Sequence, residues 1–126
     1  MLDRASSIEY PASSIMFEQK CQGAVDVISG GERISGDHVA ELKEVLEARL
    51  EGGQPLMVLD LQGVAVIDSA GLELLLDVQE KCQRMGGALK LANPGALCVE
   101  VLKATGVGAK FEIFRDSRGA VRSFVQ

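Results

Sequence analysis

The sequence contains no tryptophan, and it has one tyrosine and one histidine among 126 residues. Surfaces that bind nucleic acid use basic patches and stacking aromatic rings. Because the net charge is −5 and aromatic residues make up 4% of the chain, we expect no nucleic-acid partner. No apolar run approaches the roughly 18 residues that span a bilayer, and residues 1–7 lack the apolar core of a secretory signal. We therefore expect a cytoplasmic protein without membrane insertion.

Cysteine is also scarce. Cys21, Cys82 and Cys98 are widely spaced and form no C-x-x-C pair. We expect them to be buried, reduced thiols. The sequence shows no cluster of Cys, His and acidic residues with the spacing of metal ligands, so we expect no metal and no cofactor.

What the chain does contain is enough apolar sequence for one folded unit. Hydrophobic residues make up 47% of it and charged residues 25%, which is typical of a globular protein. A length of 126 residues suits one domain. Residues 1–13, with Ser6-Ser7 and Pro11, have the composition of a loose leader. We therefore expect a leader over 1–13 and a single domain over 14–126.

Apolar periodicity and Gly/Pro signals predict the element order ββαβαβαβ. The segment at 56–59 is apolar on both faces, which is typical of a strand in the middle of a sheet covered by helices. This order predicts a mixed sheet with helices in one layer or two. We expect strands near 15–18, 24–29, 56–59, 88–92 and 111–114, and helices near 37–51, 70–85 and 94–105. Residues 116–124 are expected to form a short final helix or a tail.

Helix ends are predicted from capping signals. Asp37 or Ser35 is expected to cap the first helix, and Asn93 followed by Pro94 is expected to open the third. In the second helix, the inner apolar stripe is expected to include Met85. We expect Leu72 and Leu76 to lie on the flank between the inner, apolar face and the solvent-exposed face of that helix.

Catalysis has little support. A nucleophile elbow has the pattern G-x-S-x-G, but Ile67 stands two residues before Ser69. The only histidine, His38, lies at the start of the first helix, where we expect it to be exposed. We therefore predict no catalytic residues and no enzymatic activity.

The run Asp68-Ser69-Ala70-Gly71-Leu72 ends an apolar stretch and begins a helix. One interpretation is structural: Asp68 or Ser69 caps the helix and Gly71 permits close packing. The other is that Ser69 accepts a phosphate, because a helix N-terminus favours negative charge. Asp68 and Glu73 would repel the phosphate, and a partner on the Leu72/Leu76 flank would then be released.

In this motif and several others, the chain resembles the STAS domain family, which includes anti-sigma factor antagonists and the cytoplasmic tails of sulfate transporters. The resemblance runs from about 15 to 115. The matching pieces are Gly31-Glu32, 58–61 with Val64 and Ile67, Asp68-Ser69-Ala70-Gly71-Leu72, 84–87, 89–94, 101–102 and 105–107.

The resemblance implies an α/β fold, with a small mixed sheet of about five strands and about four helices packed mainly on one side. It implies that Ser69 is phosphorylated by an anti-sigma factor serine kinase of the histidine-kinase-like ATPase type. The unphosphorylated antagonist binds this kinase and frees the sigma factor, phosphorylation dissociates it, and a serine phosphatase resets it. The implied partner-binding surface consists of Ser35, Asp68, Ala70, Gly71, Leu72, Glu73 and Leu76.

Two positions depart from the family pattern. Ser35 stands where Asp is usual before the first helix, and Glu73 stands where Gly is usual after the motif. A non-switching STAS subunit, in an ABC-type lipid transport complex or a signalling scaffold, is therefore the alternative function. A homodimer also stays open.

Overall fold

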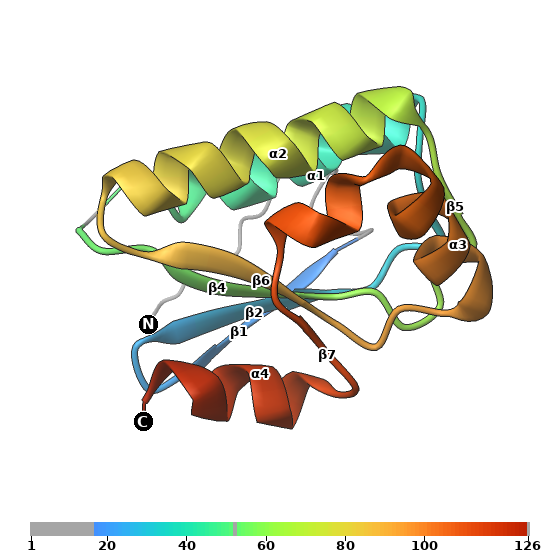
Figure 1. Cartoon of the computed structure of the whole chain (residues 1–126). Helices are drawn as coiled ribbons and strands as arrows, with labels where there is room; N and C mark the ends of the chain where they lie inside the picture. Colours follow the sequence, from blue (N-terminus) through green and yellow to red (C-terminus); the bar gives the residue numbers. More distant parts are fainter. Residues whose placement is uncertain (1–16, 52, 126) are drawn as a thin grey trace.

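The structure is a computed structural model, and it describes residues 17–51 and 53–125 (Figure 1). The predicted leader over 1–13 and the first residues of the predicted strand at 15–18 lie outside this range. The domain boundary at 14 therefore stays a prediction.

The described chain alternates strands and helices along most of its length. The elements are β1 (Glu18–Gln22), β2 (Val25–Ser29), β3 (Arg33–Ile34), α1 (Asp37–Ala48), β4 (Leu56–Asp60), β5 (Val66–Ile67), α2 (Ser69–Arg84), β6 (Ala88–Ala92), α3 (Ala96–Thr105), the 3-10 helix η2 (Val107–Lys110), β7 (Ile113–Phe114) and α4 (Ser117–Phe124).

The main sheet has five strands in the order β1-β2-β4-β6-β7. β1 and β2 form an antiparallel hairpin, and every other pair is parallel. From β2 to β7, each new strand is added on the same side of the previous one, and α1, α2 and α3 form the connections between these parallel strands. Because such connections are right-handed, the three helices lie on the same face of the sheet. Figure 1 shows α4 alone on the other face, where it contacts β2, β4 and β6. The expected mixed sheet, with helices mainly on one side, is confirmed.

The core has two parts, one on each face of the sheet. The larger part lies under α1, α2 and α3 and includes Met57 and Leu59 of β4. The smaller part lies under α4 and includes Val58 of the same strand together with Ala120. Side chains alternate between the faces of a strand, so β4 is apolar throughout because both of its faces are covered.

Two buried polar side chains tie helices to β6. The Gln79 amide of α2 donates to the Lys110 carbonyl at 3.1 Å and accepts from the Leu89 N–H at 2.8 Å. On the other face, Lys90 Nζ donates to Ser123 Oγ of α4 at 2.7 Å and lies 4.1 Å from the centre of the Phe124 ring. Each polar group is satisfied, so both residues hold a helix against the sheet at little desolvation cost.

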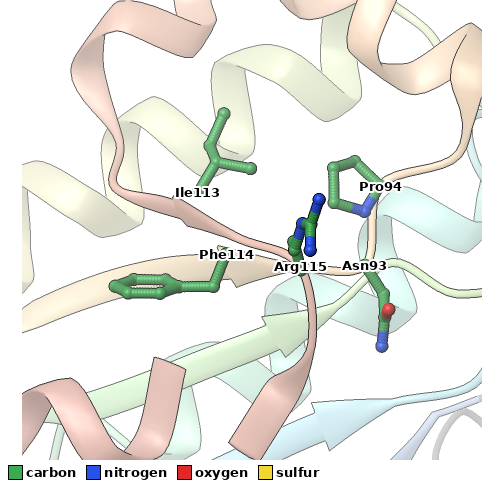
Figure 2. A pocket seen from close by; sticks show the side chains of 5 residues that line it. All are labelled: Asn93, Pro94, Ile113, Phe114 and Arg115. Carbon is green, nitrogen blue, oxygen red and sulfur yellow. The ribbon is translucent and has the colours of Figure 1, made fainter. Parts of the chain in front are cut away.

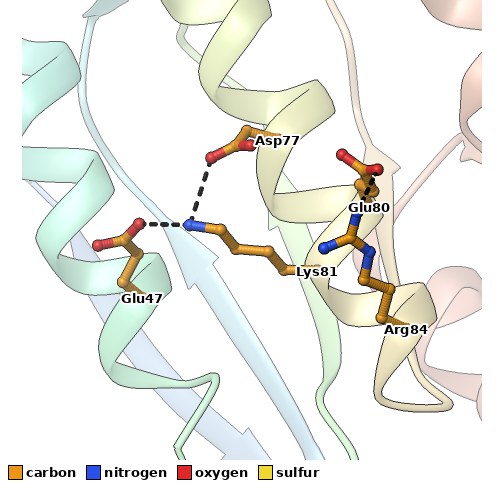
Figure 3. Close-up of polar contacts among 5 residues, drawn as sticks. All are labelled: Glu47, Asp77, Glu80, Lys81 and Arg84. Atoms are coloured by element: carbon orange, nitrogen blue, oxygen red, sulfur yellow. Dashed lines mark hydrogen bonds and ion pairs between the residues drawn. The ribbon is translucent and has the colours of Figure 1, made fainter.

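One ion pair joins α1 to α2 on the outer surface, as Figure 3 shows. Lys81 Nζ lies 3.0 Å from Glu47 of α1 and 3.3 Å from Asp77 of its own helix. Glu80 and Arg84 form an i,i+4 pair within α2 at 2.9 Å. Exposed pairs of this kind contribute little to stability.

Several expected helix and strand ends are wrong. β1 begins at Glu18, because the tight turn at Gly23 pairs Gln22 with Val25 and so sets the register of the hairpin. The N-cap of α1 is Gly36, without a side-chain cap bond, so neither Asp37 nor Ser35 caps this helix.

The third helix begins later than expected, at Ala96 with Gly95 as its N-cap. Asn93 instead has φ +57°, its backbone N–H donates to the Phe114 carbonyl, and its side chain donates to Asp60. These bonds hold Asn93 at the edge of the sheet.

Two expected burial states are also wrong. Met85 follows the last residue of α2 and is 41% exposed, because the chain leaves the helical path there. Cys21 is exposed on the edge strand β1, whereas Cys82 and Cys98 are buried as expected.

Candidate functional site

Ser69 is the first residue of α2 and is exposed. The preceding residue, Asp68, is the N-cap, and its Oδ1 accepts from the Gly71 N–H at 2.8 Å. The structural role that the sequence suggested for Asp68 is therefore present. It also leaves the Ser69 side chain outside the capping bond, at the positive end of a 16-residue helix.

A second, two-stranded sheet sets the position of this turn. β3 pairs in parallel with β5, with Arg33 opposite Val66 and Ile34 opposite Ile67. The Asp68 N–H continues the ladder by donating to the Ile34 carbonyl at 3.2 Å. Two-residue strands carry no periodicity, so this sheet cannot be predicted from the sequence.

Asp68 also connects the two helix starts. Its second oxygen, Oδ2, accepts from the Gly36 N–H at 3.2 Å, so one carboxylate joins the N-cap of α1 to the first turn of α2. Gly36 has φ +56°, a left-handed conformation that glycine adopts without steric cost. The starts of α1 and α2 therefore meet beside Ser69.

Gly71 allows the close approach of β3 to α2. A Cβ atom at this position would lie 2.5 Å from the Ile34 carbonyl oxygen and 2.8 Å from Ile34 Cγ2. Any larger residue would displace the strand whose carbonyl accepts from Asp68. The predicted role of Gly71 in close packing is confirmed.

The structure brings part of the predicted partner-binding surface together. Ala70 and Glu73 are exposed on α2 next to Ser69, and Ser35 lies in the turn before α1 that Asp68 holds. Leu76 is partly buried against the core.

Leu72 does not lie on an accessible flank, and that expectation is wrong. It is 8% exposed and belongs to the large core. α2 contacts α1, β5, β6 and η2, so its buried face is wider than a single apolar stripe.

Other chemistry has little support in the described part of the chain. His38 lies in the first turn of α1, half-buried, and no hydrogen bond between described residues joins its side chain to Ser69. Within 17–51 and 53–125, no three Cys, His, Asp or Glu side chains gather as metal ligands would. None of the helices in these ranges is long and apolar enough to cross a membrane.

The surroundings of all three cysteine thiols raise their pKa values. Burial raises the pKa of the Cys82 thiol to about 11 and also raises the pKa of Cys98. Cys21 Sγ donates to Asp26 Oδ1 at 3.1 Å, and this hydrogen bond raises the pKa of the Cys21 thiol. A nucleophilic cysteine needs a lowered pKa, so none of the three has that environment.

A shallow cavity of about 340 Å³ lies at the carboxyl ends of β6 and β7, and Figure 2 shows its lining side chains. Asn93, Pro94, Ile113, Phe114 and Arg115 line it. Ser69 is not part of this lining, so the cavity and the turn are separate features.

Comparisons with known proteins agree with this architecture. An anti-sigma-factor antagonist (STAS) domain protein from Planctomyces limnophilus is 22% identical with a TM-score of 0.78, over 87% of this chain and 98% of that one. The phosphorylated form of the Bacillus cell fate determinant SpoIIAA is 16% identical with a TM-score of 0.66, over 85% and 98%. A sulfate transporter family protein from Wolinella succinogenes is 22% identical with a TM-score of 0.67, over 96% and 92%.

No curated protein matches the chain. At 16% to 22% identity, these structural likenesses show the fold and nothing beyond it. The family model of the STAS domain, however, matches residues 19–120, a range that runs from the first hairpin into α4 and contains the Asp68–Ser69 turn. The chain therefore belongs to the STAS domain family.

Proposed function

We propose that this protein is an anti-sigma factor antagonist of a partner-switching pathway, and that Ser69 is its phosphorylation site. Unphosphorylated, it binds an anti-sigma factor serine kinase of the histidine-kinase-like ATPase type, and so releases the sigma factor. Phosphorylation of Ser69 by that kinase ends the complex, and a serine phosphatase restores the starting state. In this function Ser69 is a substrate, and the protein needs no catalytic activity of its own.

The observation that carries the proposal is the placement of Ser69. Its side chain is exposed at the first position of α2. The Asp68 carboxylate caps α2 at Gly71 and also accepts from Gly36, so it fixes the backbone at the starts of both helices. A kinase can therefore reach the hydroxyl without opening the fold. The likeness to antagonists, one of which has been solved in a phosphorylated form, supports phosphorylation as the regulating event.

Release follows from charge. A phosphate adds about −1.5 to −2 charges at pH 7. It would lie beside the exposed carboxylate of Glu73, at i,i+4 on the same helix. A partner surface that fits the neutral serine would have to accommodate this charge, and burying it without a matching cation is costly. The complex would therefore dissociate.

The test uses the histidine-kinase-like ATPases encoded in the same genome. Each is incubated with the protein and ATP, and any phosphate is located by mass spectrometry. We expect phosphate on Ser69, retained binding by Ser69→Ala and loss of the complex with Ser69→Asp. Phosphate at another residue, or equal kinase binding by the two variants, would contradict the proposal.

The chain offers a matched control in Ser117. It follows the capping residue Asp116 at the start of α4, as Ser69 follows Asp68 at the start of α2. Ser117→Asp should leave kinase binding unchanged. If it weakens binding as strongly as Ser69→Asp, charge anywhere on the protein would explain the effect.

A non-switching STAS subunit, in an ABC-type lipid transport complex or a signalling scaffold, is the second candidate. Glu73 favours it, because an exposed carboxylate next to Ser69 disfavours a second negative charge there. The likeness to a sulfate transporter family protein supports it as well, because it places this fold in a protein of a transporter family. Under this candidate, no kinase modifies Ser69 and the neighbouring genes encode transporter components.

A further inference from the structure

The capped turn at Ser69 has a counterpart elsewhere in the chain. Asp116-Ser117-Arg118-Gly119 opens α4 with the same D-S-x-G pattern. Asp116 Oδ1 accepts from the Gly119 N–H at 2.7 Å, and Asp68 Oδ1 accepts from the Gly71 N–H at 2.8 Å. Because the two turns share sequence pattern and capping bond, a kinase that acts on one of them must recognise something outside the turn.

The surroundings of Ser69 include an exposed apolar surface. Val66 of β5, three residues before Ser69, is 50% exposed, and Leu97 in the first turn of α3 is 63% exposed. α3 contacts β5, and Cys98 Sγ lies 3.3 Å from the Val64 carbonyl. Two large apolar side chains therefore reach solvent from two elements that contact each other, one of which leads directly into the turn.

α3 exposes one large apolar side chain. Seven of its ten residues are apolar, and Cys98 and Leu102 are buried. Its exposed residues are Ala96, Leu97, Glu100, Lys103, Ala104 and Thr105. Leu97 is the only large apolar side chain among them, so it is the residue of α3 that an apolar pocket of a partner would contact.

Charge differs between the two turns as well. Glu73 and Asp37 are exposed on the α1–α2 side of Ser69, whereas Arg115 and Arg118 are exposed around Ser117. A partner with an apolar pocket and one basic group that pairs with Glu73 complements the first environment and is repelled by the second. Because that group is already paired with Glu73, it does not match the further charge that a phosphate on Ser69 would add.

We propose that the kinase acting on Ser69 docks on the surface formed by Val66 and Leu97, and that this contact, together with Glu73, directs it to Ser69 in place of Ser117. The inference rests on the proposed function. A standard protein interface covers about 800 Å² on each partner, a patch of about 16 Å radius. The strand geometry puts Val66 at about 10 Å from Ser69, so a kinase centred on Ser69 covers it.

The test compares isosteric polar variants. Val66→Thr keeps β-branching and Leu97→Gln keeps helix propensity, and both side chains are exposed, so the double variant should fold. Val125→Thr is the matched control, because Val125 is 68% exposed and follows α4 on the other face. Kinase affinity is measured in the Ser69→Ala background, and the rate of phosphorylation is measured in the Ser69 background.

We expect the double variant to lose at least about tenfold in affinity and in kcat/KM, as removal of apolar anchors at an interface does. Leu97→Gln alone should account for part of the loss, and Val125→Thr should change neither quantity. Normal phosphorylation of the double variant at Ser69 would overturn the docking surface and leave the proposed function intact. If the unaltered protein neither binds nor accepts phosphate from any candidate kinase, the proposed function fails and this inference fails with it.

Discussion

Replacement of Asp68 by Ala tests whether this side chain is more than a helix cap. The variant loses two hydrogen bonds, one from the Gly71 N–H at 2.8 Å and one from the Gly36 N–H at 3.2 Å. Loss of an N-cap costs about 1 kcal/mol of unfolding free energy. A hydrogen bond to a charged group contributes about 1.5 kcal/mol or more, and the exposed Gly36 bond should lie at or below that value. We therefore expect Asp68→Ala to lower the unfolding free energy by about 2 to 2.5 kcal/mol.

The second D-S-x-G turn supplies the control. Asp116 makes the same capping bond to Gly119 at 2.7 Å, and no bond to a distant backbone group is recorded for it among the described residues. Asp116→Ala should therefore cost about 1 kcal/mol. The Asn variants separate the two bonds: Asn caps as well as Asp, so Asp116→Asn should be nearly neutral. Asp68→Asn should lose about 1 kcal/mol, because one arm of the amide cannot accept from Gly36.

Urea unfolding followed by far-UV circular dichroism measures these differences, since the chain has no tryptophan for fluorescence. The four variants should share the m-value of the parent protein. Equal losses for Asp68→Ala and Asp116→Ala would refute the reasoning, because they would show that the bond to Gly36 contributes nothing. A neutral Asp68→Asn variant would lead to the same conclusion.

Three further predictions concern packing, thiol reactivity and the pH dependence of stability. Gly71→Ala should lower the unfolding free energy by about 1–3 kcal/mol in urea unfolding, because its Cβ would lie 2.5 Å from the Ile34 carbonyl oxygen. Gly95→Ala, with open space at its Cβ, should cost less, because it loses only the preference of an N-cap for glycine over alanine. Asp26→Asn should speed alkylation of Cys21 at pH 8 several-fold, because the carboxylate that raises the thiol pKa is gone. An unchanged alkylation rate would show that Asp26 does not raise the pKa of the Cys21 thiol. Burial raises the pKa of Cys82 to about 11, above its unfolded value, so its contribution to stability should be complete below about pH 8.5 and lost as the pH rises toward that higher value.

The long periodic segments could be predicted from the sequence, because their burial follows from local pattern. α2 has a charged outer face and a wide apolar face, and β4 is apolar on both sides because helices cover both. These two elements carry most of the information about the fold class. The D-S-x-G turn at Ser69 follows from them, because it lies between an apolar stretch and a periodic helix.

What could not be predicted depends on contacts between residues distant in sequence. The start of α1 is held by Asp68, which follows β5 and lies 32 residues after Gly36 in the sequence. No local signal near Ser35 or Asp37 therefore identifies the N-cap of α1. β3 and β5 are two residues long and exist because each is the other's partner. Leu72 lies on the flank of an isolated helix, but in the fold it is 8% exposed and belongs to the large core. The second D-S-x-G turn, at 116–119, repeats the pattern at 68–71, so the sequence alone contains the signal for it.

The energetics of a phosphate at Ser69 favour a readout at an interface over a change in the fold. The N-terminus of α2 would stabilise each added charge by about 0.3–1 kcal/mol. Repulsion from Glu73 at i,i+4 would oppose it by about 0.2–0.5 kcal/mol for each unit of charge, and Asp68 would add to that repulsion. These contributions have opposite signs and similar size, and both are small beside the 5–15 kcal/mol that stabilises an ordinary domain. A kinase surface over Ser69, by contrast, would have to bury the same charge, at a cost of several kcal/mol without a matching cation. Under the proposed function, the fold around Asp68 would therefore hold the serine in place in both states, and the difference between the states would act on the partner.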